Sequence, residues 1–156
     1  MSRPRVRTLA TLAGRWGAAT VHVLAADARR PPFARAFDSV LLDAPCSGLG
    51  TLGRNPDIRW RVRPGDLARH AERQREMLDA VGGLVAPGGT LVYATCSLEP
   101  EENEGVVAPF LEASPAFVTA ALPEWAAAFA SGPFARTLPE RDGGDGFFAA
   151  RLERRS

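Results

Sequence analysis

Three continuous apolar runs, each closed by a polar residue, constrain the fold of this chain more than any other feature. The runs occupy residues 20–27, 39–43 and 90–96, and they end on Asp27, Asp43 and Cys96. Continuous rather than alternating apolarity is typical of strands covered on both faces, as in parallel sheets. Because open α/β sheets bind ligands at the carboxyl ends of their strands, we predict an α/β fold with a site at that edge.

The segments between and after these runs predict helices and a strand pair. A helix is expected before the Pro87–Gly89 stop, and a second one after Pro100. The acidic run 99–104 is interpreted as the start of that second helix rather than as a metal site, because acidic side chains favour the positive end of a helix. Residues 134–138 and 146–152 predict an antiparallel pair. The first helix is expected to bury one stripe: Leu67, Ala71, Gln74, Leu78, Val81 and Val85.

Composition limits the classes of protein that need to be considered. The 156 residues, 46% of them hydrophobic and 24% charged, suit one globular domain. The chain has no apolar run near the roughly 20 residues that cross a bilayer, and Met1 leads into no signal peptide, so we predict a cytoplasmic protein without a membrane partner. Neither His22 nor His70 has a ligand partner at metal spacing, and no metal is predicted.

The two cysteines lie in short turns that follow two of the apolar runs. Cys46 belongs to Asp43-Ala44-Pro45-Cys46-Ser47-Gly48, and Cys96 belongs to Thr95-Cys96-Ser97. Two cysteines are too few for a disulfide scaffold. A Pro-Cys turn alone says little, but a pair of thiols at the ends of two neighbouring strands is a far more specific signal. Two packed core thiols remain the structural alternative.

These motifs resemble the ribosomal RNA small subunit methyltransferase B family of RNA cytosine-5 methyltransferases, also called the Sun family. The resemblance runs over nearly the full length and includes residues 43–60, 95–104 and 145–148. It implies that residues 1–156 are the C-terminal part of a catalytic domain with a Rossmann-like, S-adenosylmethionine-dependent methyltransferase fold. It also implies methylation of carbon 5 of cytosine in RNA, with 16S ribosomal RNA favoured. A transfer RNA cytosine-5 methyltransferase and a catalytically silent RNA-binding fragment are the alternatives.

The family resemblance assigns roles to four residues. Cys96 would be the thiolate that adds to carbon 6 of cytosine and so activates carbon 5. Cys46 would act in product release. DNA cytosine-5 methyltransferases place their nucleophile in the Pro-Cys turn, at the position of Cys46, but the second cysteine turn favours the RNA enzymes. Asp27 would meet the adenine side of S-adenosylmethionine, and Asp43 the methionine end.

An arginine-rich stretch offers candidates for contact with RNA. Residues 54–75 hold seven arginines and only three acids. Arg54, Arg59 and Arg61 are predicted to bind phosphates, and Trp60 is available to stack on a base. For the arginines of the following helix, a solvated helix face is an equally good interpretation.

Two expected parts of the cofactor site are missing from the sequence. The family places a glycine-rich turn after its first strand and an acid after its second, and neither is found before an arginine-containing helix that residues 5–16 could form. We therefore expect an N-terminally truncated sheet. In the family's strand order the missing strands lie between residues 21–26 and residues 40–42. The first of these segments should then lack a neighbour, the second should become an edge, and binding of S-adenosylmethionine should be poor.

Overall fold

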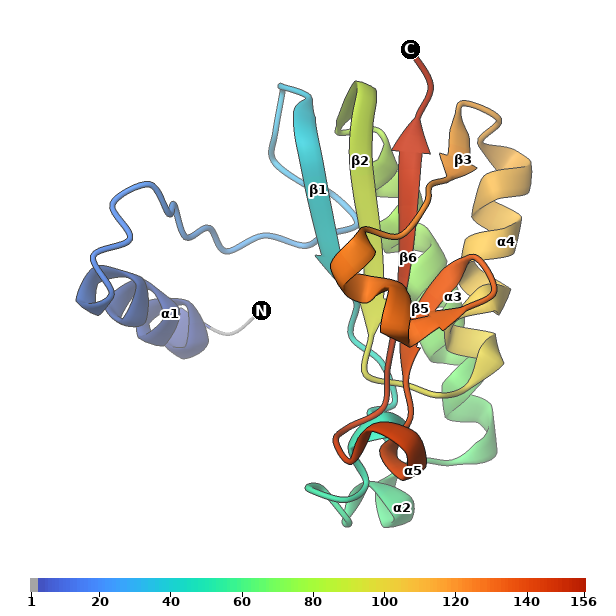
Figure 1. The fold of residues 1–156 in the computed structure, drawn as a ribbon. Helices are drawn as coiled ribbons and strands as arrows, with labels where there is room; N and C mark the ends of the chain where they lie inside the picture. The colour runs from blue at the N-terminus through green and yellow to red at the C-terminus, as the bar shows by residue number, and fades with distance from the viewer. Residues whose placement is uncertain (1–2) are drawn as a thin grey trace.

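Six strands form one mixed sheet in the computed structural model, which describes residues 3–156 (Figure 1). The strand order is β1-β2-β6-β5-β4, and β3 pairs with β6 outside this path. β1 and β2 are parallel, whereas the other neighbours are antiparallel. The strands are β1 (Phe37–Asp43), β2 (Val85–Thr95), β3 (Phe117–Thr119), β4 (Ala130–Ser131), β5 (Phe134–Thr137) and β6 (Phe147–Arg154).

Helices connect the strands and cover one face of the sheet. α3 (Pro64–Gly82) joins β1 to β2, as a parallel pair requires. α4 (Glu104–Ala113) packs against α3, and both lie behind the sheet in Figure 1. The remaining helices are α1 (Arg3–Arg15), α2 (Ile58–Arg61) and α5 (Pro139–Asp142), with 3₁₀ turns at Leu49–Thr51, Pro100–Glu102 and Glu124–Phe129.

The main elements expected from the sequence are confirmed. β1 and β2 include most of the second and third apolar runs, and they pair in parallel with Asp43 opposite Ala94. The predicted helix stop is wrong, because α3 ends at Gly82 and both Val85 and Pro87–Gly89 lie within β2. The predicted antiparallel pair is formed by β5 and β6. On α3, the predicted stripe is buried at Ala71, Gln74, Leu78 and Val81.

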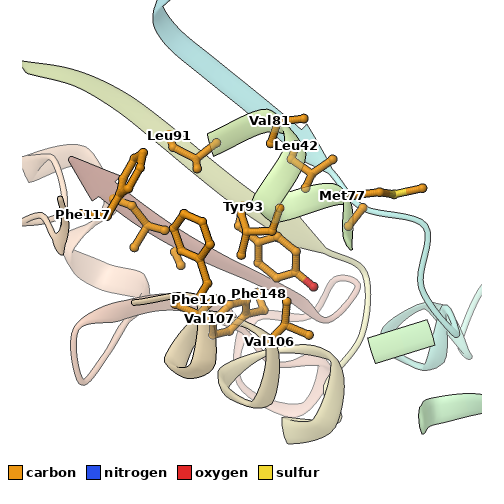
Figure 2. Packing of buried hydrophobic residues seen from close by; sticks show 14 of the residues in the cluster. Leu42, Met77, Val81, Leu91, Tyr93, Val106, Val107, Phe110, Phe117 and Phe148 are labelled. Atoms are coloured by element: carbon orange, nitrogen blue, oxygen red, sulfur yellow. The ribbon is translucent and has the colours of Figure 1, made fainter. Parts of the chain in front are cut away.

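The core lies between the sheet and the α3–α4 layer (Figure 2). Leu91 and Tyr93 on β2, with Leu152 on β6, are fully buried. They meet Leu78 of α3 and Val107 of α4 in one cluster. Because the Tyr93 hydroxyl donates a 2.6 Å hydrogen bond to the Glu102 carbonyl, its burial leaves no lone polar group. The core therefore ties β2 firmly to the segment that begins α4.

β1 departs from the expectation that its strand is covered on both faces. Leu42 is only 6% exposed, but Leu41, on the opposite face, is 69% exposed. β1 has one strand neighbour, β2, so its outer side is an edge of the sheet as expected. In Figure 1, α1 lies apart from the sheet and does not cover this face. The apolar run therefore predicted a strand correctly, while one of its faces is open in this chain.

The first apolar run does not form the predicted strand. Residues 21–27 have no regular secondary structure, and Val21 and Leu24 are each 53% exposed. A strand needs a partner for its backbone hydrogen bonds, and no strand of residues 3–156 lies beside this segment. The residues between α1 and β1 run as an extended connection instead (Figure 1).

The open edge of β1 predicts self-association of this chain. An exposed apolar strand edge presents unpaired backbone groups and invites pairing with another chain. We expect oligomers of the wild-type chain in size-exclusion chromatography with light scattering, and a shift toward monomer in Leu41→Lys. Trp125→Lys, which removes an 80% exposed apolar side chain that is not part of β1, is the control and should not produce that shift. A monodisperse wild-type monomer at the same concentration would contradict this account of the edge.

None of the helices described for residues 3–156 combines the length and the apolarity needed to cross a membrane.

Candidate active site at the carboxyl ends of β1 and β2

The parallel pairing of β1 and β2 brings the two cysteines together. Cys96 follows the last residue of β2, and Cys46 lies in the turn that follows β1. Their Sγ atoms are 3.0 Å apart although 50 residues separate them in sequence. The expectation that the two turns would lie side by side at this edge is therefore confirmed.

The surroundings of the pair favour the protonated form of the Cys46 thiol. Burial raises the pKa of Cys46 to about 12, and the hydrogen bond and the electrostatic interaction with Cys96 act in the same direction. Cys46 therefore keeps its proton at neutral pH, and it can donate that proton to the sulfur of Cys96. A protonated thiol is a poor nucleophile but a suitable proton donor.

Backbone contacts from two glycines hold the Cys96 turn. The Gly50 N–H donates to the Cys96 carbonyl at 3.0 Å, and the Gly146 N–H donates to the Gly50 carbonyl at 2.7 Å. A side chain at Gly50 would overlap the Gly146 carbonyl, so this crossing requires a residue without a Cβ atom. The crossing joins the turn after β1, the turn after β2 and the start of β6.

A cavity of about 610 Å³ opens beside the thiols. Both acids predicted to meet the cofactor line it, together with both cysteines. The remaining lining residues are Ala26, Ala28, Leu42, Ala44, Pro45, Arg73 and Met77. Although residues 21–27 do not form a strand, the structure still places Asp27 and Asp43 in one cavity.

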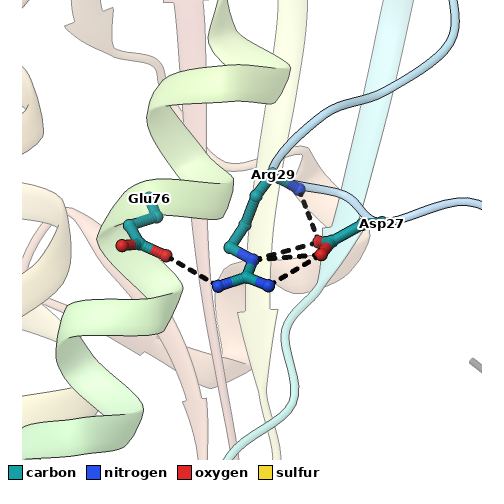
Figure 3. A network of polar contacts seen from close by, with 3 residues as sticks. All are labelled: Asp27, Arg29 and Glu76. Atoms are coloured by element: carbon teal, nitrogen blue, oxygen red, sulfur yellow. Dashed lines mark hydrogen bonds and ion pairs between the residues drawn. The ribbon is translucent and has the colours of Figure 1, made fainter.

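The Asp27 carboxylate is already engaged by a basic neighbour (Figure 3). It accepts hydrogen bonds from the Arg29 backbone N–H at 3.0 Å and from Arg29 Nη2 at 2.7 Å. Arg29 Nη1 reaches Glu76 of α3 at 3.2 Å. The Arg29 hydrogen bonds hold the pKa of Asp27 well below its usual range. Asp27 is therefore ionised at neutral pH, and Arg29 links its loop to α3.

The predicted RNA contacts lie exposed at the same end of the molecule. α2, which carries Arg59, Trp60 and Arg61, lies beyond the carboxyl end of β1 in Figure 1, and Trp60 is 83% exposed. Arg54 is paired with Asp145, and Arg61 is paired with Asp57 at 2.8 Å. Arg59 Nε donates to the Pro56 carbonyl at 3.1 Å. The arginine of each ion pair is exposed, although the Asp145 side chain is only 10% exposed, so a polyanion can reach both guanidinium groups.

Three buried polar residues behind the site were not predicted as parts of it. Glu102, Asn103 and Gln74 are fully buried, and Glu102 and Gln74 bond to the turn that contains Cys46. The interpretation of residues 99–104 as a helix start is confirmed, since a 3₁₀ turn spans Pro100–Glu102 and α4 begins at Glu104, but the burial of the Glu102 side chain was not predicted. Gln74 carried a usable signal, since it is a polar residue within an apolar stripe.

Comparison with known proteins places the whole chain in one group. Residues 1–153 match the model of the family described as 16S rRNA methyltransferase RsmB/F. The ribosomal RNA small subunit methyltransferase B of Salmonella paratyphi B is 49% identical over 116 residues, which are 74% of this chain. The chain spans only 26% of that relative, and the same holds for the Salmonella newport protein.

Solved structures show which fold the chain adopts. The crystal structure of PH0851 matches 98% of this chain with a TM-score of 0.91 and 38% identity, and 35% of its own chain is covered. NSun6 from Pyrococcus horikoshii, determined with SFG, matches 99% of this chain with a TM-score of 0.81 and 30% identity, over 40% of its own chain. The fold is thus that of part of an α/β S-adenosylmethionine-dependent methyltransferase, and the chain belongs to the 16S rRNA methyltransferase RsmB/F family.

Proposed function

We propose that this chain supplies the catalytic thiols for S-adenosylmethionine-dependent methylation of carbon 5 of cytosine in 16S ribosomal RNA. The observation that carries the proposal is the contact of Cys46 with Cys96 at the mouth of a cavity lined by Asp27 and Asp43. Residues 1–156 form the C-terminal part of the catalytic domain in this proposal. RNA is the partner, through the Arg54, Arg59, Arg61 and Trp60 surface.

Each thiol has a separate task in this reaction. The Cys96 thiolate adds to carbon 6 of cytosine, and the electron pair moves to carbon 5, which then bonds to the methyl group. A water molecule then takes the proton from carbon 5, the electrons of that carbon–hydrogen bond restore the double bond between carbons 5 and 6, and the bond to Cys96 breaks with its electron pair left on the sulfur. Cys46, held protonated beside Cys96, can protonate the departing thiolate as it is released. The base must leave its stack to reach Cys96, because the thiol lies inside a turn.

The residues present fit one side of S-adenosylmethionine, which supplies the electrophilic methyl group when it is bound. Asp27 would hold the adenine side and Asp43 the methionine end, and both line the same cavity. Leu41 is exposed on β1, next to the cavity residue Leu42, so this edge of the sheet beside the cavity is open to solvent. The chain alone thus lacks the enclosure that gives a small-molecule site its affinity.

Calorimetric titration measures this deficit directly. We expect no binding of S-adenosylmethionine at micromolar concentrations by the 156-residue chain. Asp27 and Asp43 line the same open cavity, and two acidic side chains alone do not enclose the cofactor. Micromolar binding by a monodisperse monomer would show that the residues present suffice for the cofactor.

A chimera tests the proposed function. Residues of this chain replace the matching segment of the Salmonella methyltransferase B, to which it is 49% identical, and 5-methylcytosine in 16S ribosomal RNA is mapped in cells lacking the native enzyme. We expect methylation to be restored at the site of that enzyme. A folded chimera that methylates transfer RNA instead would support a transfer RNA cytosine-5 methyltransferase. A folded chimera that methylates no RNA would support a catalytically silent RNA-binding fragment.

The arginine surface predicts a change in the salt dependence of RNA binding. Neutralising Arg54, Arg59 and Arg61 together in the chimera should weaken binding and reduce the slope of log affinity against log salt by roughly one unit for each phosphate that is no longer bound. A matched triple change at Arg30, Arg35 and Arg155, which are exposed outside this surface, removes the same charge. Equal slopes for the two triple variants would show that Arg54, Arg59 and Arg61 face solvent and do not bind RNA phosphates.

A further inference from the structure

Two consecutive buried polar residues lie directly behind the cysteine turns. Glu102 and Asn103 are both 0% exposed. No ion pair to Glu102 occurs among residues 3–156, so hydrogen bonds alone stabilise its carboxyl group. Burial of a carboxyl group costs free energy unless its oxygens are hydrogen-bonded, so Glu102 needs specific partners at this position.

Glu102 binds the turn that carries Cys46 directly at Ser47 and, through Gln74, at Pro45. Its Oε1 accepts from the Ser47 N–H at 2.9 Å, and its Oε2 accepts from Ser47 Oγ at 2.5 Å. Gln74 Nε2 donates both to Glu102 Oε1 and to the Pro45 carbonyl, each at 3.0 Å. The residue after Cys46 is thereby fixed to the carboxyl group, and the residue before it is fixed to the same group through the Gln74 amide.

Asn103 does the same for the turn that carries Cys96. Its Oδ1 accepts from Thr95 Oγ1 at 2.6 Å, and its Nδ2 donates to the Ser97 carbonyl at 3.0 Å. The hydroxyl oxygens of Ser47 and Ser97 are 3.3 Å apart, and their hydrogen bond joins the Cys46 turn to the Cys96 turn. The residues before and after Cys96 are thus fixed to one amide group.

We propose that Glu102 and Asn103 are positioning residues that together set the contact between Cys46 and Cys96. The inference rests on the proposed function, in which both thiols act on one cytosine. Neighbouring Cα atoms along a chain are separated by about 3.8 Å whatever the rest of the fold does. A pair of adjacent residues that each hold one turn therefore converts this covalent distance into a fixed spacing of the turns. The Tyr93 hydroxyl, bonded to the Glu102 carbonyl, anchors the pair to β2.

Phenylarsine oxide reports on this spacing in the 156-residue chain without any methylation. One molecule reacts with two thiols, forming two arsenic–sulfur bonds and releasing one water, with no change of oxidation state. Because both sulfur atoms must reach the same arsenic atom, the affinity depends on how well the thiols are already placed together. We expect Glu102→Ala and Asn103→Ala each to weaken this binding at least tenfold. The exposed neighbour provides the control, and Glu101→Ala should bind as the wild type does.

A conservative variant separates positioning from charge. In Glu102→Gln, the retained Oε1 can still accept from Ser47 N–H and Gln74, while the new amide can donate to Ser47 Oγ. We therefore expect Glu102→Gln to bind phenylarsine oxide within about threefold of the wild type, since each contact keeps a hydrogen bond and only the one with Ser47 Oγ reverses its direction. A tenfold loss in Glu102→Gln would show that the carboxylate charge is needed, which contradicts a purely positional role.

The pH profile of Cys46 gives a second readout that loss of stability alone does not produce. In folded alanine variants, separation from Cys96 should lower the pKa of Cys46, so its alkylation at pH 8 should accelerate, while circular dichroism stays native. If an alanine variant does not fold, Asn103→Asp decides, because it keeps the acceptor for Thr95 and loses the donor to Ser97. Wild-type arsenical affinity in a folded Asn103→Asp would overturn the proposal. Failure of the proposed function would appear separately, as wild-type thiol behaviour in a chimera that does not methylate.

Discussion

Replacement of Cys96 by alanine in the chimera is expected to abolish methylation of cytosine. Without a thiolate at carbon 6, carbon 5 remains a poor nucleophile, and loss of a covalent nucleophile costs on the order of 10³-fold or more in rate. Incorporation of labelled methyl groups into RNA measures the effect. The control is Cys96→Ser, which keeps the size of the side chain but supplies a far weaker nucleophile, and it should be equally inactive.

The matching change at Cys46 is expected to give a different defect. Cys46→Ala keeps the attacking thiol, so addition to RNA should proceed, while release should slow because the proton donor beside Cys96 is gone. A covalent complex of protein and RNA should accumulate and remain visible in a denaturing gel. A complex that survives Cys96→Ala but disappears in Cys46→Ala would exchange the roles of the two thiols.

Alkylation of Cys46 by iodoacetamide is expected to be about a thousandfold slower at pH 8 than that of a free thiol. The pKa of Cys46 is raised from its ordinary value of 9.0 to about 12, mainly by burial. Only the thiolate reacts, and three units of pKa reduce its fraction at pH 8 about a thousandfold. Because the pKa is raised, the rate should climb roughly tenfold per pH unit until about pH 12. Peptide mass spectrometry at a series of pH values measures it.

Cys96→Ala provides the internal control for that pH profile. Hydrogen bonding and electrostatic interaction with Cys96 also raise the pKa of Cys46, so their removal should move the profile to lower pH, while burial keeps it above the ordinary value. A wild-type Cys46 that reacts as fast as a cysteine in an unfolded peptide would contradict the buried, paired environment of the thiol.

The sequence predicted best those features that depend on local pattern. The apolar runs at 39–43 and 90–96 became β1 and β2, and their parallel pairing brought Cys46 and Cys96 into contact. This step was predictable because the carboxyl ends of neighbouring parallel strands share one edge of a sheet. Apolar periodicity likewise predicted the buried stripe of α3.

Features that depend on partners elsewhere in the fold were less predictable. Residues 20–27 have the composition of a strand, yet no strand of the described chain pairs with them, and Leu41 is exposed for a related reason. The inward orientation of Glu102 was hidden within an acidic run, because its partner Ser47 is 55 residues away in sequence. A pattern read along the chain does not reveal such a pairing. The ion pair between Asp27 and Arg29 could have been predicted from the sequence, because the two residues are only two positions apart.

Cys96 is expected to form the bond to cytosine, and identifying the peptide that carries the nucleotide tests this directly. Methylated cytosine normally leaves after its proton at carbon 5 is removed, but a fluorine atom at carbon 5 cannot leave as a cation, so the covalent intermediate persists. The chimera is incubated with S-adenosylmethionine and 16S ribosomal RNA that contains 5-fluorocytosine, and the modified peptide is then sequenced by mass spectrometry. The account predicts that the nucleotide is attached to Cys96; attachment to Cys46, or an active chimera without any attached nucleotide, would contradict it.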